Sequence, residues 1–317
     1  MIATTGTLAT GLRKAFFVEF GLYALWLGLS LKNGASIAAA MCGPLLTWVA
    51  IRVVVTAKNF AQTELNKSPR EPEERVGLFG AIRLFWGELW ITCLTYSFFF
   101  PFEQQFTPPA PTKELPHQGL PIVLVPGFAC NRGYFYLLRK WLAKAGYGKV
   151  YAVTLEPVFG SIEKNAECLG QQLESICAHS GSEKVILIGH SMAGLTMRVY
   201  LHQQGGAKRV AKAISLGAPH HGTVIAKGLG KVGKNLEQMQ PYGDWNTAFN
   251  GATLKQPAPV PFVNVITPHD NIVAPQHSCR LGETYGKQVV LTGIGHLEMI
   301  ASKPVLKVIL DELKDQP

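Results

Sequence analysis

Two long apolar stretches near the N-terminus constrain this chain more than any other feature of its sequence. Residues 15–31 carry a single charged side chain, Glu19, and residues 33–51 carry none. A helix needs about 20 mostly apolar residues to cross the hydrocarbon core of a bilayer, and both stretches come close to that length. Because Lys32, Asn33 and Gly34 interrupt them, the pattern predicts a transmembrane helical hairpin.

A third apolar stretch, residues 84–102, has Glu88 as its one charge and is rich in aromatic residues. Trp86, Trp90 and Tyr96 suit the aromatic belt at a membrane–water interface. The stretch predicts either a third span or a helix that lies along the membrane surface. Residues 1–102 are therefore expected to form a membrane region of two to three apolar helices.

Two other interpretations of the N-terminus are open. Two basic residues precede the apolar core, and Ala38–Ala40 resembles the cleavage site of a signal peptide. However, apolar sequence resumes after residue 40, which favours a retained anchor. The remaining alternative is a soluble chain that buries these stretches in its own core.

The distribution of Lys and Arg predicts the orientation of the hairpin. Arg13 and Lys14 precede the first stretch and six basic residues fall within 52–83, whereas only Lys32 separates the first two stretches. By the positive-inside rule, the N-terminus and residues 52–83 are cytoplasmic. The expected location is a bacterial-type inner membrane. The rest of the chain lies outside the cytoplasm if 84–102 spans, and inside it if this stretch lies flat.

Composition excludes several classes of protein. The chain is 47% hydrophobic and only 16% charged, which excludes intrinsic disorder. Its net charge is +9, from 30 Lys and Arg against 21 Asp and Glu, but it lacks a run of five basic residues and any nucleic-acid-binding signature. Basic residues beside apolar stretches indicate a membrane as the partner, with no nucleic acid. The six cysteines have no metal-ligand spacing.

Residues 103–118 contain four prolines and predict an extended linker. Beyond it, residues 119–317 alternate between short apolar runs and helical patterns. Continuous β-branched runs are typical of parallel strands buried on both faces, so we expect a doubly wound, mostly parallel α/β sheet. The predicted strands are 122–125, 150–153, 185–188, 213–216, 262–266 and 289–291, and the predicted helices include 161–178, 195–204 and 304–313.

Ser191 stands directly between a predicted strand and a predicted helix, in Val-Ile-Leu-Ile-Gly-His-Ser-Met-Ala-Gly-Leu. A serine there lies on a sharp turn that exposes its hydroxyl. The stretch resembles the nucleophile elbow of the α/β-hydrolase superfamily, in its lipase and esterase branch, although Ala193 occupies the last position of the Gly-x-Ser-x-Gly pattern. The resemblance covers about residues 119–313.

The resemblance also implies an oxyanion hole and a catalytic triad. Residues 122–135 resemble the strand and loop that supply one oxyanion donor; because Pro126 has no N–H, the expected donors are the backbone N–H groups of Phe128 and Met192. The superfamily orders its triad as serine, acid, histidine. Asp270 and His296 follow predicted strands in that order, and they are the predicted acid and base for Ser191.

Histidines other than His296 are expected to have other roles. We expect His190 to pack away from the nucleophile, His220 and His221 to shape the rim of the site, and His269 to lie on the loop surface. Residues 222–258 form a long basic insert, predicted to be either a lid over the site or a solvated loop. The sequence predicts no metal site, and because a GxGxxG loop is lacking it predicts no cofactor.

These features predict a membrane-anchored serine hydrolase that cleaves carboxylic esters, with lipid-derived esters as substrates, through an acyl-enzyme on Ser191. One alternative keeps the same triad in an acyltransferase or thioesterase. Another is a non-catalytic membrane scaffold with a hydrolase fold. The oligomeric state is not predicted.

Overall fold

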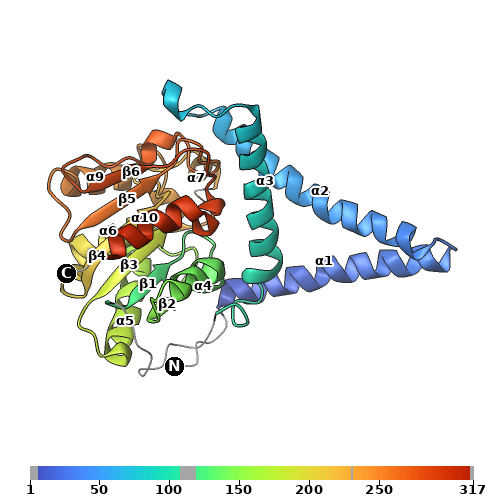
Figure 1. The fold of residues 1–317 in the computed structure, drawn as a ribbon, viewed down its shortest axis with the longest axis horizontal. Coiled ribbons are helices and arrows are strands. Elements are labelled where there is room, and N and C mark those ends of the chain that lie inside the picture. The colour runs from blue at the N-terminus through green and yellow to red at the C-terminus, as the bar shows by residue number, and fades with distance from the viewer. Residues whose placement is uncertain (1–5, 108–118, 230, 315–317) are drawn as a thin grey trace.

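The computed structural model describes residues 6–107, 119–229 and 231–314, so most of the predicted linker at 103–118 lies outside the described residues. In the described part, three long N-terminal helices precede an α/β domain (Figure 1). The doubly wound α/β class predicted from the alternating apolar runs is confirmed.

A six-stranded parallel sheet forms the centre of the α/β domain, in the order β2-β1-β3-β4-β5-β6. All residues of β1, β3, β4 and β5 are buried, because helices cover both faces of the sheet. The edge strand β6 is partly exposed. The strands are β1 Ile122–Val125, β2 Val150–Ala152, β3 Val185–His190, β4 Val210–Leu216, β5 Phe262–Ile266 and β6 Lys287–Val290.

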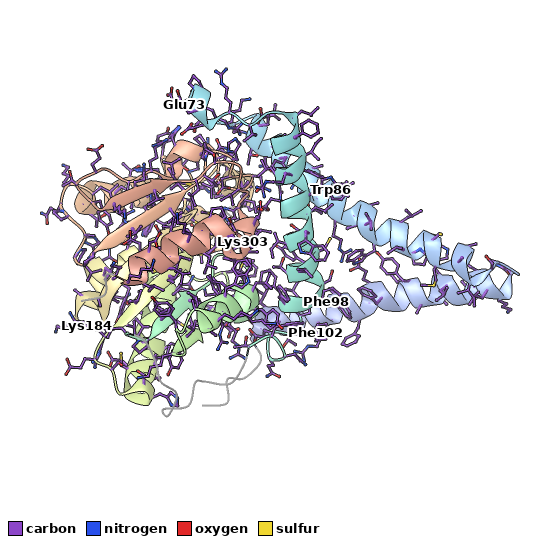
Figure 2. All side chains as sticks on the ribbon, viewed as in Figure 1. Glu73, Trp86, Phe98, Phe102, Lys184 and Lys303 are labelled. Atoms are coloured by element: carbon purple, nitrogen blue, oxygen red, sulfur yellow. The ribbon has the colours of Figure 1, made fainter. Side chains whose placement is uncertain are left out.

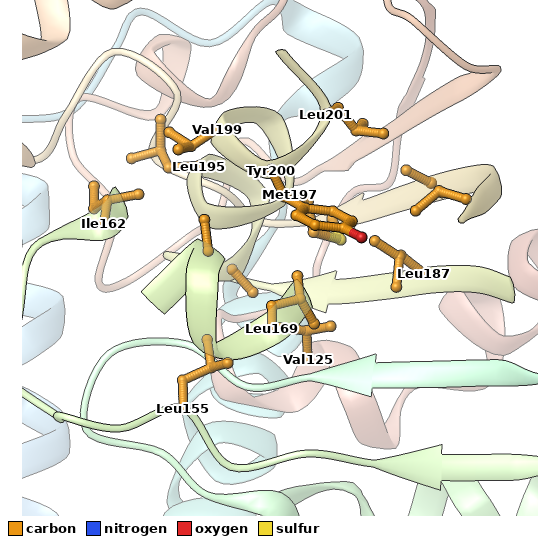
Figure 3. Close-up of a cluster of buried hydrophobic side chains, with 14 of the residues drawn as sticks. Val125, Leu155, Ile162, Leu169, Leu187, Leu195, Met197, Val199, Tyr200 and Leu201 are labelled. Carbon is orange, nitrogen blue, oxygen red and sulfur yellow. The ribbon is translucent and has the colours of Figure 1, made fainter. Parts of the chain in front are cut away.

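Each face of the sheet carries one apolar core. The inward faces of α5 (Ile162–Ser180) and α6 (Ala193–Gln203) build one core, part of which Figure 3 shows. On the other face, α4 (Tyr136–Lys144) and α10 (Lys303–Lys314) pack over the same strands. Local signals set the ends of α5: the Ser161 hydroxyl accepts a hydrogen bond from the N–H of Lys164, and Gly181 ends the helix in a left-handed conformation.

The N-terminal helices are α1 (Thr7–Lys32), α2 (Ile37–Glu64) and α3 (Leu78–Leu94), the last continuing as a π-helical turn to Phe99. By length and composition, all three are candidate membrane spans. Helices α1 and α3 begin before the predicted stretches 15–31 and 84–102, and α2 continues past residue 51, because helical hydrogen bonding does not stop where apolar residues do. Helix α2 begins later than the predicted residue 33, and the helical residues after α3 end at Phe99, before the predicted residue 102. The predicted break at 32–34 is present, and the Ser36 hydroxyl caps α2.

The three helices differ in how they meet the α/β domain. Helices α1 and α2 project away from it and meet at a distant tip, whereas α3 lies between this hairpin and the domain (Figure 1). In the most apolar 18-residue segment of each helix, 0% of the α1 residues and 11% of the α2 residues are buried, against 33% of the α3 residues. Phe98 and Phe102 lie where α3 returns to the base of α1 (Figure 2), and Phe102 packs edge-on against Phe16 with the ring centroids 5.0 Å apart.

One ion pair joins α1 to α2 within their apolar surfaces. The guanidinium of Arg52 donates to both carboxylate oxygens of Glu19, with Nη2 at 2.8 Å from Oε2. The hydroxyl of Tyr23 donates to the same carboxylate at 2.9 Å. Pairing makes the burial of these charges in an apolar environment less costly.

Candidate active site

Ser191 occupies a strained turn between β3 and α6. Its φ is +58°, a left-handed conformation that costs a non-glycine residue about 1–2 kcal/mol. Two backbone hydrogen bonds hold the turn: the N–H of Ser191 donates to Leu216 O at 2.8 Å, and the N–H of Gly194 donates to Ser191 O at 2.9 Å. Ser191 is half-buried, whereas its neighbours His190 and Met192 are buried. The turn therefore leaves the serine as the accessible residue of this segment.

The loops after β5 and β6 bring together the predicted acid and base. Nδ1 of His296 lies 2.7 Å from Oδ2 of Asp270. The other oxygen of Asp270 accepts hydrogen bonds from the N–H groups of Ile272 at 2.8 Å and Val273 at 2.6 Å. Both side chains are almost fully buried. Asp270 is therefore held by its own loop and fixes the orientation of the imidazole.

Burial and the carboxylate of Asp270 act in opposite directions on the pKa of His296. Burial alone would lower the pKa of the imidazole, but the adjacent carboxylate and its hydrogen bond outweigh burial and raise this pKa above its ordinary value. An imidazole with a raised pKa binds a proton more readily than a free histidine does. This is the property that a general base needs.

His190 connects the nucleophile segment to the segment that carries His296. Its Nε2 donates to the carbonyl oxygen of His296 at 3.0 Å, and the two rings lie 4.6 Å apart between centroids. The Tyr134 hydroxyl donates to the next carbonyl, of Leu297, at 3.1 Å. We predicted only packing for His190; its direct contact with His296 was missed, although its position before Ser191 was a usable signal.

Two unpaired backbone donors flank Ser191. Across residues 6–107, 119–229 and 231–314, neither the N–H of Phe128 nor that of Met192 has a hydrogen-bond partner. The Phe128 loop lies against Ser191, because a Cβ placed on Gly127 would stand 2.8 Å from Cβ of Ser191. An N–H group without a protein partner can donate a hydrogen bond to water or to a ligand. These two are therefore available to an oxygen atom of a ligand.

Gly217, at the end of β4, lies against the Asp270–His296 pair and was not singled out from the sequence. Its φ is +57°, and an added Cβ would stand 2.9 Å from Sδ of Met299, 3.3 Å from Oδ2 of Asp270 and 3.4 Å from Nδ1 of His296. A side chain at this position would displace the pair. The sequence signal was a glycine directly after a buried strand.

For the ester hydrolysis expected from the sequence, Gly217→Ala should therefore lower kcat by about tenfold to hundredfold, since a displacement of about 1 Å has effects of that size. Steady-state hydrolysis of a water-soluble ester measures the loss. Gly251→Ala is the matched control, because an added Cβ there, on the helix Asp244–Thr253, has no neighbour within 4 Å. Equal activity of Gly217→Ala and Gly251→Ala would contradict the close packing described above.

His220 and His269 have structural partners. His220 is fully buried, and its Nε2 lies 3.3 Å from Oδ1 of Asn264. The prediction that His269 lies on the loop surface was wrong: the residue is 2% exposed, and its Nδ1 accepts a hydrogen bond from the N–H of Gly293 at 3.0 Å. Burial, with a smaller contribution from the charge of Arg70, lowers the pKa of His269 to about 4.

The insert at 222–258 contains three short helices, α7 (Ile225–Leu229), α8 (Lys234–Gln238) and α9 (Asp244–Thr253). Oε1 of Gln238 accepts from the N–H of Ile162 at 2.7 Å. The buried guanidinium of Arg198 donates to Asn250 at 2.9 Å and to Thr253 at 2.7 Å. The insert is thus anchored to α5 and α6, and its role as a lid stays a prediction.

Comparison with known proteins finds similarity over parts of the chain. A family described as the alpha/beta hydrolase fold matches residues 161–240. A triacylglycerol lipase of Vibrio cholerae is 34% identical over 111 residues, which are 33% of this chain and 34% of the relative. The match thus spans about a third of the length of that relative.

Solved structures extend the similarity to more than half of the chain. A lipase of Bacillus licheniformis in its mature form superimposes with a TM-score of 0.56 at 17% identity, over 64% of this chain and 95% of that one. Lipase B of Aspergillus fumigatus superimposes with a TM-score of 0.55 at 21% identity, over 62% of this chain and 53% of that one. The chain has the α/β-hydrolase fold, as the nucleophile-elbow resemblance predicted, and its relatives in structure and sequence include lipases.

Proposed function

We propose that this protein is a membrane-anchored serine hydrolase that cleaves carboxylic esters, with lipid-derived esters as its substrates. The observation that carries the proposal is the buried Asp270–His296 pair, in contact with the segment that presents Ser191 on a strained turn. The unpaired N–H groups of Phe128 and Met192 beside this turn support the same chemistry. Similarity to lipases supports the ester as the bond that is cleaved.

The reaction then proceeds in two halves. Nε2 of His296 accepts the proton of the Ser191 hydroxyl as Oγ attacks the ester carbonyl, and the oxygen that becomes negative accepts hydrogen bonds from Phe128 and Met192. His296 returns its proton to the departing alkoxide, which leaves as the alcohol. Water, deprotonated by the same imidazole, attacks the acyl-enzyme and releases the carboxylic acid and free Ser191. Asp270 stabilises the imidazolium in both halves.

The surroundings of the site favour a lipid substrate. The first turn of α1 and the loop at 156–159 line an apolar cleft of about 800 Å³. Phe159 of this cleft packs against Phe128, with ring centroids 5.8 Å apart. An acyl chain in this cleft would lie between the base of a membrane helix and the proposed oxyanion loop. We therefore expect the rate to rise with acyl chain length.

The test compares wild type with Ser191→Ala, purified as the full chain in detergent, on a series of acyl esters from short to long chains. We expect Ser191→Ala to lose about 10⁶-fold in kcat, a loss typical for removal of a serine nucleophile. Release of the free acid in water would support a hydrolase over an acyltransferase. Equal ester cleavage by wild type and Ser191→Ala would refute the proposal.

We further propose that α1 and α2 cross the membrane as a hairpin, whereas α3 lies flat and the α/β domain is cytoplasmic. At 1.5 Å per residue α1 is ~39 Å long, enough for a hydrocarbon core of about 30 Å. The buried face of α3 and the contacts of the segments on either side of it support its flat position. The segment before it binds the domain through Arg70 and Pro268 O at 2.9 Å, and the segment after it through Phe100 O and Asn131 at 2.9 Å.

A reporter fused after Pro317 tests this topology. We expect a green fluorescent protein to be fluorescent there and alkaline phosphatase to be inactive, because the phosphatase needs the oxidising side of the membrane for its disulfides. Fusions after Lys32, at the tip of the hairpin, are the matched control. There we expect an active alkaline phosphatase and a green fluorescent protein that is not fluorescent. An active phosphatase after Pro317 would show that α3 spans.

A further inference from the structure

Glu88 is the one acidic residue of α3, and it is buried against the α/β domain. Its side chain is 1% exposed, in a helix whose other residues are mostly apolar. Its Oε1 accepts a hydrogen bond from the N–H of Glu298 at 2.7 Å, and its Oε2 accepts one from the side-chain amide of Asn271 at 3.4 Å. An apolar residue at position 88 would leave the N–H of Glu298 unpaired.

Both partners of Glu88 adjoin the proposed triad. Glu298 is two residues beyond His296, and Asn271 directly follows Asp270. Oδ1 of Asn271 accepts a hydrogen bond from the N–H of His296 at 2.9 Å. One carboxylate of an N-terminal apolar helix thus binds the loop of the acid and the loop of the base, and Asn271 links the two loops to each other.

The contact between α3 and the His296 loop is close. A Cβ placed on Gly295 would stand 2.2 Å from Cγ of Glu88, so the glycine before His296 is required for the carboxylate to reach its partners. One turn earlier in α3, Arg83 donates to the carboxylate of Glu298 at 2.9 Å and to the carbonyl oxygen of Gly293. Helix α3 therefore holds the loop on both sides of His296.

We propose that Glu88 is a positioning residue for His296, so that the apolar helix α3 forms part of the catalytic machinery. This inference rests on the proposed function. Glu88 fixes the backbone of 296–298 through the N–H of Glu298, and Asn271 fixes the N–H of His296 itself. These two hydrogen bonds, to the N–H groups of Glu298 and His296, restrict the loop to the conformation in which the imidazole can accept a proton from Ser191. Glu88 acts through His296 and contacts no substrate.

The test measures kcat, KM and the rate at which a fluorophosphonate labels Ser191, with the full chain in detergent. We expect Glu88→Ala to lower kcat and the labelling rate by about tenfold to hundredfold and to leave KM within about twofold, because misplacement of the base slows the chemical step and not binding. Glu88→Gln should recover most of the loss, since its amide oxygen still accepts from Glu298.

Leu89→Ala is the matched control, because Leu89 is buried on the same helix and has no polar role. Its thermal stability should fall while kcat stays near the wild-type value. If Glu88→Ala does not fold, Asn271→Ala supplies the same measurement, since it removes the bond to the N–H of His296.

The inference is overturned by wild-type kcat in Glu88→Ala or, if that variant does not fold, in Asn271→Ala. It is also overturned if kcat falls as far in Leu89→Ala as in Glu88→Ala and if the kcat of Glu88→Gln is no higher than that of Glu88→Ala. In these cases the wild type still labels at Ser191 and hydrolyses esters, so the proposed function stands. A wild type that neither labels nor hydrolyses would remove both proposals.

Discussion

Replacing His296 by alanine is expected to lower kcat for ester hydrolysis by about 10⁶-fold, as much as the loss of Ser191 itself, because the serine and its base act as one unit. Without the imidazole, Ser191 loses its proposed base, and a serine hydroxyl is a weak nucleophile at its ordinary pKa. His190, the nearest other imidazole, cannot replace it, since burial holds the pKa of His190 well below the usual range.

Single-turnover hydrolysis of an activated ester measures the effect of His296→Ala. His179→Ala is the matched control, because His179 is exposed at the end of α5. The double variant Ser191→Ala/His296→Ala should be no slower than either single variant. A kcat for His296→Ala within tenfold of wild type would mean that another group serves as the base.

Asp270→Asn is expected to lower kcat by about 10⁴-fold, the loss that this replacement causes where a histidine depends on an aspartate for its tautomer. The amide keeps the shape of the side chain but carries no charge, and it can present an N–H to Nδ1 of His296. The imidazole then has its proton on the wrong nitrogen, or it loses its hydrogen bond.

The same variant should shift the pH profile. In the wild type, Asp270 raises the pKa of His296, so activity rises with pH and reaches its plateau above the range of an ordinary histidine. Without the carboxylate, burial remains and lowers that pKa, so the acid limb of kcat/KM moves to lower pH. Asp244→Asn, at an exposed position in α9, should leave the profile unchanged. An unshifted acid limb in Asp270→Asn would contradict the assigned role.

The α/β domain could be predicted from its sequence because buried parallel strands are short, continuous and apolar. Two predicted strands, 122–125 and 262–266, match β1 and β5 to the residue. The strand predicted at 213–216 begins earlier, at Val210, because Lys212 interrupts the apolar run. The ammonium of Lys212 reaches the carbonyl oxygen of Glu312 at 2.7 Å, so a charged residue can occupy a buried strand.

Contacts between distant segments could not be predicted in the same way. Hydropathy identifies α3 as an apolar helix, but it does not distinguish a helix that contacts lipid from one that packs against protein. Glu88 was noted only as a charge within that stretch, and its partner Glu298 is more than 200 residues away. His269 was misplaced for the same reason, because its burial depends on a loop after a different strand.

Proton transfer from Ser191 to His296 is the central claim, and labelling by a fluorophosphonate, followed by mass spectrometry of the modified peptide, tests it most directly. We predict a single adduct on Ser191, formed at a rate that rises with pH to a plateau as His296 loses its proton, and no adduct at a comparable rate in His296→Ala. An intact, unlabelled Ser191 in the folded wild type, or equal labelling of the wild type and His296→Ala, would contradict it.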